Sequence, residues 1–445
     1  MTQPLFGTDG VRAVAGSWPL DPPTIARLGA ALSRGLRIGR PARFLVGRDT
    51  RESGEWIERE LARGAASQGA SVTSAGVIPT PGVAYLARAL DFDLGVVISA
   101  SHNPYHDNGI KVFSGRGEKF GDASERAVEA MVADMSWSVG RDTEAHLETG
   151  DLRETYLRHV RRLLPAAGPL KGARLALDMA NGATTTTARQ LFESLGFDLV
   201  TLGDAPDGRN INLACGSTHP ASLAASVVAH GCRLGVAFDG DGDRAIFVDQ
   251  RGHVIDGDAV LLVIGLDFQR RGRLVGDTVV ATVMSNIGLE IAFRDRGIRL
   301  VRTPVGDKYV MEEMLRHGYT IGGEQSGHVI LSEHLSTGDG MATALAVLRV
   351  MAETGRELSD LAGELVTFPQ TLVNVRVREK KDVATVPEIA AAVARVEAAL
   401  DGRGRLLVRY SGTEPLLRIM IEGEDQATVQ AWAEEIAEAA RGTLG

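Results

Sequence analysis

The apolar residues of the chain fall into short continuous runs, each followed by a loop of small and polar residues. Three such runs end in VVISASHN, LALDMANG and VVATVMSN, at positions 96–103, 175–182 and 279–286. A continuous apolar run of this length is typical of a buried strand. Because the pattern occurs three times, we treat it as a weak internal repeat and predict three α/β units of related build.

Between the apolar runs, hydrophobic residues recur every three to four positions, which is the spacing of an amphipathic helix. In 23–38, for example, Ile25, Leu28 and Leu32 would share one face. The same reasoning predicts helices at 54–68, at 123–135 and on through 152–164, and at 185–195, 258–270 and 289–296. Strands are predicted at 43–46, 71–77, 94–98, 110–113, 174–178, 234–238, 245–248, 278–283 and 299–303. A turn is expected at Pro79–Pro81. Alternating strands and helices predict mostly parallel sheets with helices on both faces, and ligands beyond the carboxyl ends of the strands.

The composition changes after Phe368-Pro369, where a linker leads into a different pattern. An alternating strand at 371–378, a helix at 386–400, two strands flanking 409–418 and a helix at 426–441 indicate a small α+β domain. We therefore predict an α/β protein with three related mixed-sheet α/β domains and a C-terminal α+β domain. The predicted domains span 1–153, 154–254, 255–367 and 368–445.

Composition excludes several classes of partner. The net charge of the 445-residue chain is −9 and no cluster of Lys or Arg stands out, so no nucleic-acid partner is expected. The longest apolar stretch, near 259–266, is too short to span a membrane. The N-terminus lacks a signal pattern, and neither of the two cysteines lies in a CxxC motif. A cytoplasmic, soluble protein is expected.

The most unusual loop follows the strand at 94–98 and contains Ser101. Pro104 prevents a helix, and an Asn-Gly turn leads into a second extended run that carries Lys111 back toward the serine. A serine hydrolase is disfavoured, because no GxSxG motif is present and His102 is too close in sequence to act as a base for its neighbour. A zinc site at His102 and His106 is disfavoured, because Pro104 interrupts the helix that their spacing needs.

Asp239, Asp241 and Asp243 alternate with glycine between two apolar strands. Three converging carboxylates repel one another unless a cation lies between them, and ligand sets of oxygen alone favour Mg²⁺ or Ca²⁺. An EF-hand is excluded because Arg244 and Gln250 stand where that loop needs Gly and Glu. A solvated acidic turn is the remaining alternative.

Three further loops carry candidate chemistry. The N-terminal LFGTDGVRA stretch combines two glycines, an acid and Arg12. The TPVGDK and GGEQSGH loops, at 303–308 and 322–328, offer the mixture of acid, amide, hydroxyl and imidazole that suits a polyol. The RYSGTEP stretch at 409–415, with Arg418 beyond it, is a plausible phosphate cradle, although it is not a P-loop. The N-terminal stretch could alternatively be a flexible leader, the TPVGDK and GGEQSGH loops ordinary polar turns, and RYSGTEP a surface hairpin.

Together, SASHNP, DGDGDR, GEQSGH and RYSGTEP resemble the α-D-phosphohexomutase family over essentially the whole chain. GEQSGH, through Gln325, and CGSTHP at 215–220 are most similar to the members that act on glucosamine phosphates. Two departures are Ala13, where the family usually has Gly, and Lys308, where Arg is common. The resemblance implies four domains around a central cleft, a homodimer through the first domain and a hexosamine phosphate substrate.

The resemblance also implies roles for individual residues. Ser101 would be a phosphoserine and would share one Mg²⁺ with the three aspartates. Lys111 would be the general acid/base, and Arg12 and His102 would complete the catalytic group. The implied substrate ligands are Arg244, Gly306, Asp307, Glu324, Ser326 and His328. The implied ligands of the second phosphate are Arg409, Ser411, Gly412, Thr413 and Arg418.

The expected reaction is the interconversion of glucosamine 6-phosphate and glucosamine 1-phosphate through glucosamine 1,6-bisphosphate, for amino-sugar nucleotide and cell-wall synthesis. One alternative is a mannose or glucose phosphate mutase of the same family. The other is a binding protein without activity, against which the presence of Ser101, Lys111 and all three aspartates argues.

Overall fold

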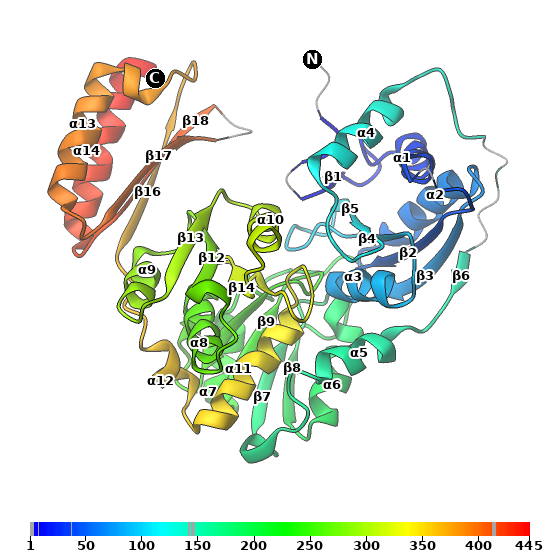
Figure 1. The fold of residues 1–445 in the computed structure, drawn as a ribbon, viewed down its shortest axis with the longest axis horizontal. Helices are drawn as coiled ribbons and strands as arrows, with labels where there is room; N and C mark the ends of the chain where they lie inside the picture. The colour runs from blue at the N-terminus through cyan, green and yellow to red at the C-terminus, as the bar shows by residue number, and fades with distance from the viewer. Residues whose placement is uncertain (1–3, 8, 37, 141–142, 144–146, 412–414) are drawn as a thin grey trace. The chain divides into compact units, whose positions relative to one another are not determined.

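The computed structural model describes residues 4–7, 9–36, 38–140, 143, 147–411 and 415–445. The chain forms two compact units (Figure 1). The first unit comprises Met1–Met284 and Ile298–Gly363, and the second comprises Ser285–Gly297 and Glu364–Gly445. Within the described residues, no helix is long and apolar enough to cross a membrane.

The first sheet of the first unit has six strands in the order β1-β5-β4-β2-β3-β6. Its strands are β1 (Val11–Val14), β2 (Arg43–Arg48), β3 (Ser71–Val77), β4 (Leu94–Ile98), β5 (Asp107–Ser114) and β6 (Leu147–Thr149). Strands β2, β3, β4 and β6 are parallel, whereas β5 runs antiparallel to both β4 and β1. The antiparallel β4–β5 pair makes the Ser101 loop a connection between two neighbouring strands.

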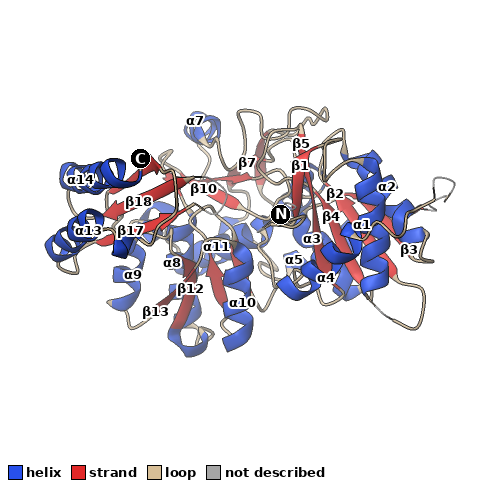
Figure 2. Ribbon diagram, turned by 90° about the horizontal axis from the view of Figure 1, so that it is seen from above, coloured by secondary structure: helices blue, strands red, loops and turns tan. Residues whose placement is uncertain are grey.

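Helices cover both faces of this sheet (Figure 2). Helices α1 (Pro22–Gly35), α2 (Gly54–Ala66) and α4 (Asp122–Ala133) share a core with alternate strand residues such as Phe44 and Val96. Helix α3 (Thr80–Ala89) packs on the opposite face, where a Cβ at Gly47 would lie 2.5 Å from the Val83 side chain. Strand glycines therefore allow α3 to approach the sheet closely.

Two expectations for this region are wrong. The turn expected at Pro79–Pro81 is the start of α3, because proline is tolerated in the first turn of a helix, where its missing N–H has no partner to lose. The helical stretch expected to run from α4 onward is interrupted by β6 before α5 (Arg153–Arg161).

The second sheet has the order β11-β10-β9-β7-β8 and the third has β13-β12-β14-β15. The second sheet comprises β7 (Arg174–Asp178), β8 (Asp198–Leu202), β9 (Leu234–Phe238), β10 (Ala245–Asp249) and β11 (Val254–Ile255), with α6 (Ala188–Ser194) and α7 (Ala221–His230). The third comprises β12 (Thr278–Thr282), β13 (Arg299–Thr303), β14 (Ile321–Gly323) and β15 (Val329–Leu331), with α8 (Gly257–Arg270), α10 (Asp307–His317), α11 (Gly340–Thr354) and α12 (Leu358–Ala362). Both sheets are mixed, as predicted.

The three sheets repeat one arrangement. Parallel inner strands end in an antiparallel pair, which is β4–β5 in the first sheet, β9–β10 in the second and β14–β15 in the third. The loops within these pairs carry Ser101, the three aspartates and the GEQSGH sequence. The predicted repeat of related units is therefore present, but the strand orders align β4 with β9 and β14, not with β7 and β12 as the sequence pattern indicated.

The second unit has an antiparallel sheet in the order β16-β18-β17. Its elements are β16 (Gln370–Arg376), β17 (Arg405–Tyr410), β18 (Leu416–Glu422), α9 (Ile287–Arg294), α13 (Pro387–Leu400) and α14 (Gln426–Leu444). Helices α13 and α14 lie side by side on the sheet (Figure 1) and share its apolar core. Helix α9 joins this unit because the Ile287 N–H donates to Glu422 Oε2 at 3.2 Å. The predicted fold class, three mixed α/β sheets followed by a small α+β fold, is confirmed.

Candidate functional site

The structure brings the Ser101 loop and the aspartate loop into direct contact. The Ser101 hydroxyl donates to Asp239 Oδ2 at 2.5 Å. Lys111, on β5, has its Nζ 2.9 Å from Asp241 Oδ2 and 3.3 Å from Asp243 Oδ2. All five side chains are buried. The serine, the lysine and the three carboxylates therefore form one site at the ends of two sheets.

The aspartate loop fits a divalent cation. One carboxylate oxygen from each aspartate lies within 4.8 Å of the others. Burial, together with the charges of Asp243 and Asp241, raises the pKa of Asp239 well above its usual value. In the described part of the chain, Asp241 Oδ1 is buried and accepts no hydrogen bond. An oxygen-only cluster with like-charge repulsion and a free oxygen has the chemistry of a metal site, without identifying the ion.

Glycine between the aspartates permits the close approach of the two loops. A Cβ at Gly240 would lie 2.5 Å from the Ser101 carbonyl oxygen, so a larger residue would push the loops apart. Gly242 has a φ of +72°, a backbone conformation that is unfavourable for residues with a Cβ atom.

Lys111 is held as a cation. Burial alone would lower the pKa of its ammonium group, but the charges of Asp241, Asp9 and Asp243 outweigh burial and raise the pKa well above the usual value. A lysine in this state can stabilise negative charge and donate a proton. In this arrangement Lys111 is a fixed positive charge beside the aspartates.

His102 lies beside the serine hydroxyl, and Arg244 lies beside His102. His102 Nδ1 lies 3.3 Å from Ser101 Oγ and 3.3 Å from Arg244 Nη1. Burial and the charges of Arg244 and Arg12 lower the pKa of His102 to about 4, so the ring is neutral at neutral pH. Within the described residues, the Nε atoms of Arg12 and Arg244 are buried and donate no hydrogen bond. These unused donors suit an anion bound at the serine.

The predicted polyol loop lies against the aspartate loop. Arg244 and His328 form a β-bridge. Glu324 Oε1 accepts a hydrogen bond from the Gly306 N–H at 3.1 Å, and Ser326 is exposed. The Gln325 amide donates to Asp256 Oδ2 at 3.1 Å. Asp256 is the N-cap of α8. Gln325, the residue on which the expectation of glucosamine rested, therefore forms a hydrogen bond to the start of a helix.

A chain of polar contacts through His328 links the aspartate loop to Asp307. His328 Nδ1 lies 3.5 Å from Asp243 Oδ1, and His328 Nε2 lies 3.4 Å from Asp307 Oδ2. Lys119 donates to Asp307 and, at 2.7 Å, to Asp9 Oδ1. Asp9 also forms an ion pair with Arg12. Asp9 and Lys119 were not predicted as site residues, although Asp9 lies in the Gly-flanked N-terminal motif that the sequence singled out.

Sequence reasoning also missed Arg51, whose side chain is fully buried beneath the Ser101 loop. Its Nε donates to Asp49 Oδ2 at 2.9 Å, and its other nitrogens donate to the carbonyl oxygens of Ser101, Asn103, Pro104 and Asp107. Asp49 in turn accepts from the Ser99 hydroxyl, which accepts from the Ser101 N–H at 2.9 Å. This network holds Ser101 at a φ of +52°, a strained value for serine. The GRDTR sequence at 47–51, where β2 ends, is rich in charge but does not indicate which loop Arg51 contacts.

In the second unit, Arg409 on β17 and Arg418 on β18 are directly paired neighbours. Burial and the charge of Arg418 lower the pKa of Arg409. The Ser411 carbonyl accepts from Lys380 Nζ at 2.6 Å. Gly412 and Thr413 lie outside the described residues.

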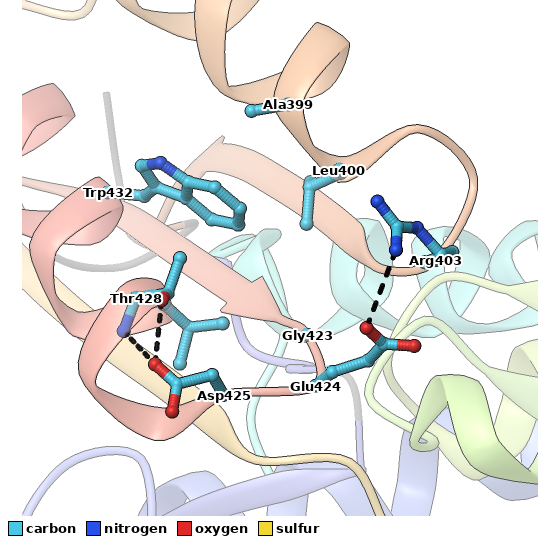
Figure 3. A pocket seen from close by; sticks show the side chains of 9 residues that line it. Ala399, Leu400, Arg403, Gly423, Glu424, Asp425, Thr428 and Trp432 are labelled. Carbon is cyan, nitrogen blue, oxygen red and sulfur yellow. Dashed lines mark hydrogen bonds and ion pairs between the residues drawn. The ribbon is translucent and has the colours of Figure 1, made fainter.

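Figure 3 shows a cavity elsewhere in this unit, between the end of α13 and the start of α14. Trp432 lines it, together with an ion pair of 3.8 Å between Arg403 and Glu424. None of the residues that line this cavity is a predicted phosphate ligand.

Four family models match consecutive stretches of the chain. They are the alpha/beta/alpha domains I, II and III of phosphoglucomutase/phosphomannomutase, at residues 3–138, 154–252 and 256–368, and the C-terminal domain, at 372–439. All four models therefore occur in order along one chain.

Full-length relatives are similar as well. A phosphoglucosamine mutase of Solibacter usitatus is 50% identical over 448 residues, covering 100% of both chains. A phosphoglucosamine mutase of Syntrophotalea carbinolica is 46% identical, covering 100% of this chain and 99% of the relative. Among solved structures, a phosphoglucomutase/phosphomannomutase family protein of Burkholderia thailandensis is 25% identical with a TM-score of 0.82, covering 99% of this chain and 98% of that one.

Proposed function

The chain belongs to the phosphoglucomutase/phosphomannomutase family, and we propose that it acts as a phosphoglucosamine mutase. Its reaction is the interconversion of glucosamine 6-phosphate and glucosamine 1-phosphate, with glucosamine 1,6-bisphosphate as the intermediate. The observation that carries a mutase function is the buried Ser101 hydroxyl on Asp239, beside Lys111 and unused arginine donors. The choice of glucosamine rests on the full-length relatives.

The proposed reaction begins with a phosphoryl group on Ser101. A sugar hydroxyl attacks the phosphorus, the new sugar O–P bond forms, and the bond from phosphorus to Ser101 Oγ breaks. The resulting bisphosphate reorients within the site. Its other phosphoryl group is then transferred to Ser101 Oγ. Each transfer moves one proton from the attacking hydroxyl to the departing oxygen, so protons balance over the cycle.

The residues around Ser101 support this chemistry. The cationic Lys111 supplies a proton to the departing oxygen, and the neutral His102 is the neighbouring group that can accept one. The spare N–H groups of Arg12 and Arg244 bind oxygens of the transferring group. Asp239, Asp241 and Asp243, with the Ser101 phosphate, would hold Mg²⁺, which when bound neutralises charge on the transferring phosphoryl group.

The other predicted residues take binding roles. The proposed sugar ligands are Gly306, Asp307, Glu324, Ser326 and His328. The proposed ligands of the phosphate that is not being transferred are Arg409, Ser411, Gly412, Thr413 and Arg418. In this division, residues 1–153 carry the phosphoserine, 154–254 the metal ligands, 255–367 the sugar loop and 368–445 the second phosphate site.

Kinetic comparison of three substrates tests the proposal. We expect kcat/KM for glucosamine 1-phosphate to exceed the values for glucose 1-phosphate and mannose 1-phosphate, and the Ser101→Ala variant to be inactive with all three. A higher value for mannose or glucose 1-phosphate would reassign the substrate within the family. Full activity of Ser101→Ala would exclude the phosphoserine mechanism itself.

We propose that the enzyme acts in the cytoplasm and as a homodimer. Both cysteines are free thiols, which is consistent with a reducing cytoplasm. The family resemblance implies a homodimer through the first domain, and sedimentation of the purified chain tests it by its mass.

A further inference from the structure

We propose that Thr80 is a positioning residue for the metal ligand Asp241. In this role, Thr80 fixes the aspartate so that one carboxylate oxygen stays available to a divalent cation. The inference rests on the proposed function only in requiring a cation at the three aspartates. It concerns a residue that lies far from Asp241 in sequence and that no motif connects to metal binding.

Thr80 holds Asp241 at two points. The Thr80 hydroxyl donates to Asp241 Oδ2 at 2.6 Å, and the Thr80 N–H donates to the Asp241 carbonyl oxygen at 2.9 Å. The side chain and the backbone of the aspartate are therefore both fixed by one residue. Thr80 is itself completely buried, so water does not compete for these bonds.

The two oxygens of the Asp241 carboxylate have different surroundings. Oδ2 accepts from the Thr80 hydroxyl and from Lys111 Nζ at 2.9 Å. Oδ1 accepts no hydrogen bond from any described residue, although it is buried. Because its partners occupy Oδ2, the carboxylate cannot rotate without breaking two bonds, and Oδ1 is left as the oxygen for a cation.

The local fold explains why residue 80 contacts the aspartate loop. Thr80 is the first residue of α3, where a backbone N–H has no acceptor within the helix and needs one elsewhere. Pro79 precedes it, and a Cβ at Gly242 would lie 3.2 Å from the Pro79 Cβ atom. The aspartate loop therefore sits directly on the start of α3. The partial positive charge of this helix end also favours the nearby carboxylate.

Removing the hydroxyl should weaken cation binding without removing a ligand. Partners of this kind typically change metal affinity by about 10- to 100-fold. Thr80→Val keeps the size and branching of the side chain but leaves Oδ2 with Lys111 alone. Thr80→Ser keeps the hydroxyl and should bind the cation nearly as tightly as the unaltered chain.

Titration of the purified full-length chain with Mg²⁺, and with Mn²⁺ as a spectroscopic probe, measures this effect directly. We expect the metal Kd of Thr80→Val to rise by about 10-fold or more. Activity should return at high Mg²⁺, because the ligands themselves are intact. Thr343→Val is the matched control, since Thr343 is equally buried but its hydroxyl donates to the carbonyl oxygen of Asp339, the N-cap of α11, and its metal Kd should not change.

The outcomes separate this inference from the proposed function. An unchanged metal Kd in Thr80→Val would overturn the role of Thr80 alone. If Thr80→Val does not fold, Thr80→Ala, which also removes the hydroxyl, decides: a metal Kd that rises in Thr80→Ala but not in Thr80→Ser supports the role of Thr80, and an unchanged Kd in Thr80→Ala overturns it. Failure of the unaltered chain to bind either cation would overturn the metal site, and with it this inference.

Discussion

Replacing Arg51 with lysine should destabilise the protein and slow phosphoryl transfer, because the Arg51 guanidinium donates hydrogen bonds to the backbone of the Ser101 loop. All five N–H groups of the guanidinium are used, one on Asp49 and four on carbonyl oxygens of the loop. A lysine ammonium has three N–H groups on one atom and no planar fork. At least two of the five acceptors would therefore lose their donor, and three of the five are only partly buried.

The loss of stability can be estimated from the number of acceptors that lose their donor. An unsatisfied buried polar group costs about 1–3 kcal/mol, and water can reach a partly buried one, so Arg51→Lys should lower the free energy of unfolding by up to about 6 kcal/mol. The lysine would keep a positive charge beside Asp49, which avoids the further cost of about 3–5 kcal/mol for a broken buried ion pair. The Ser101 backbone, freed from its strained φ, would also place the hydroxyl less accurately.

Urea unfolding and steady-state kinetics measure both consequences. We expect a lower unfolding midpoint for Arg51→Lys and a kcat that falls more than the sugar KM changes. Arg48→Lys is the matched control, because Arg48 ends β2 three residues before Arg51 but forms its ion pairs with Glu55 and the buried Glu58 instead of holding the Ser101 loop. A variant Arg51→Lys with wild-type stability and wild-type kcat would refute the reasoning.

Three further predictions concern other titratable groups. Asp241→Asn should remain folded by circular dichroism yet lose its Mg²⁺-dependent activity, and full activity in chelator would contradict the metal assignment. Burial and the charge of His334 lower the pKa of His159 to about 4, below the unfolded value of about 6.5, so stability should fall as pH drops through this window. His159→Gln should flatten that part of the stability–pH curve, and an unchanged slope would exclude the residue. Burial and the charge of Asp178 raise the pKa of Cys215 to about 11, so native protein should react slowly with iodoacetamide at neutral pH and unfolded protein rapidly, whereas fast native labelling would be inconsistent with the environment described.

The hydrophobic pattern predicted most strands and helices because their burial is one-sided or complete, and both leave a clear periodicity. The strand at 71–77 and the buried run at 94–98 match β3 and β4. The pattern failed at α3, where Pro-Thr-Pro is equally compatible with a turn and with a helix start. It also aligned the repeat on the wrong strands, because β7 and β12 share the apolar character of β4 and only the pairing of strands distinguishes them.

The residues of the site were predictable where their chemistry is concentrated in one loop, as in Ser101 and the three aspartates. Arg51 and Thr80 were not, because each acts on a loop distant in sequence, and nothing in a lone arginine or threonine indicates what it contacts. The Gln325 amide shows the reverse case. It stood out in a motif, yet in the structure it donates to Asp256 at the start of α8.

The phosphoryl group of Ser101 is the centre of the proposed mechanism, and its transfer can be followed directly. The purified enzyme, labelled with radioactive phosphate on Ser101, is mixed with glucosamine 6-phosphate and sampled during the first turnovers. The account predicts that label leaves the protein and appears in glucosamine 1,6-bisphosphate, and that Ser101→Ala acquires no label. Product formation while the label stays on the protein would contradict it.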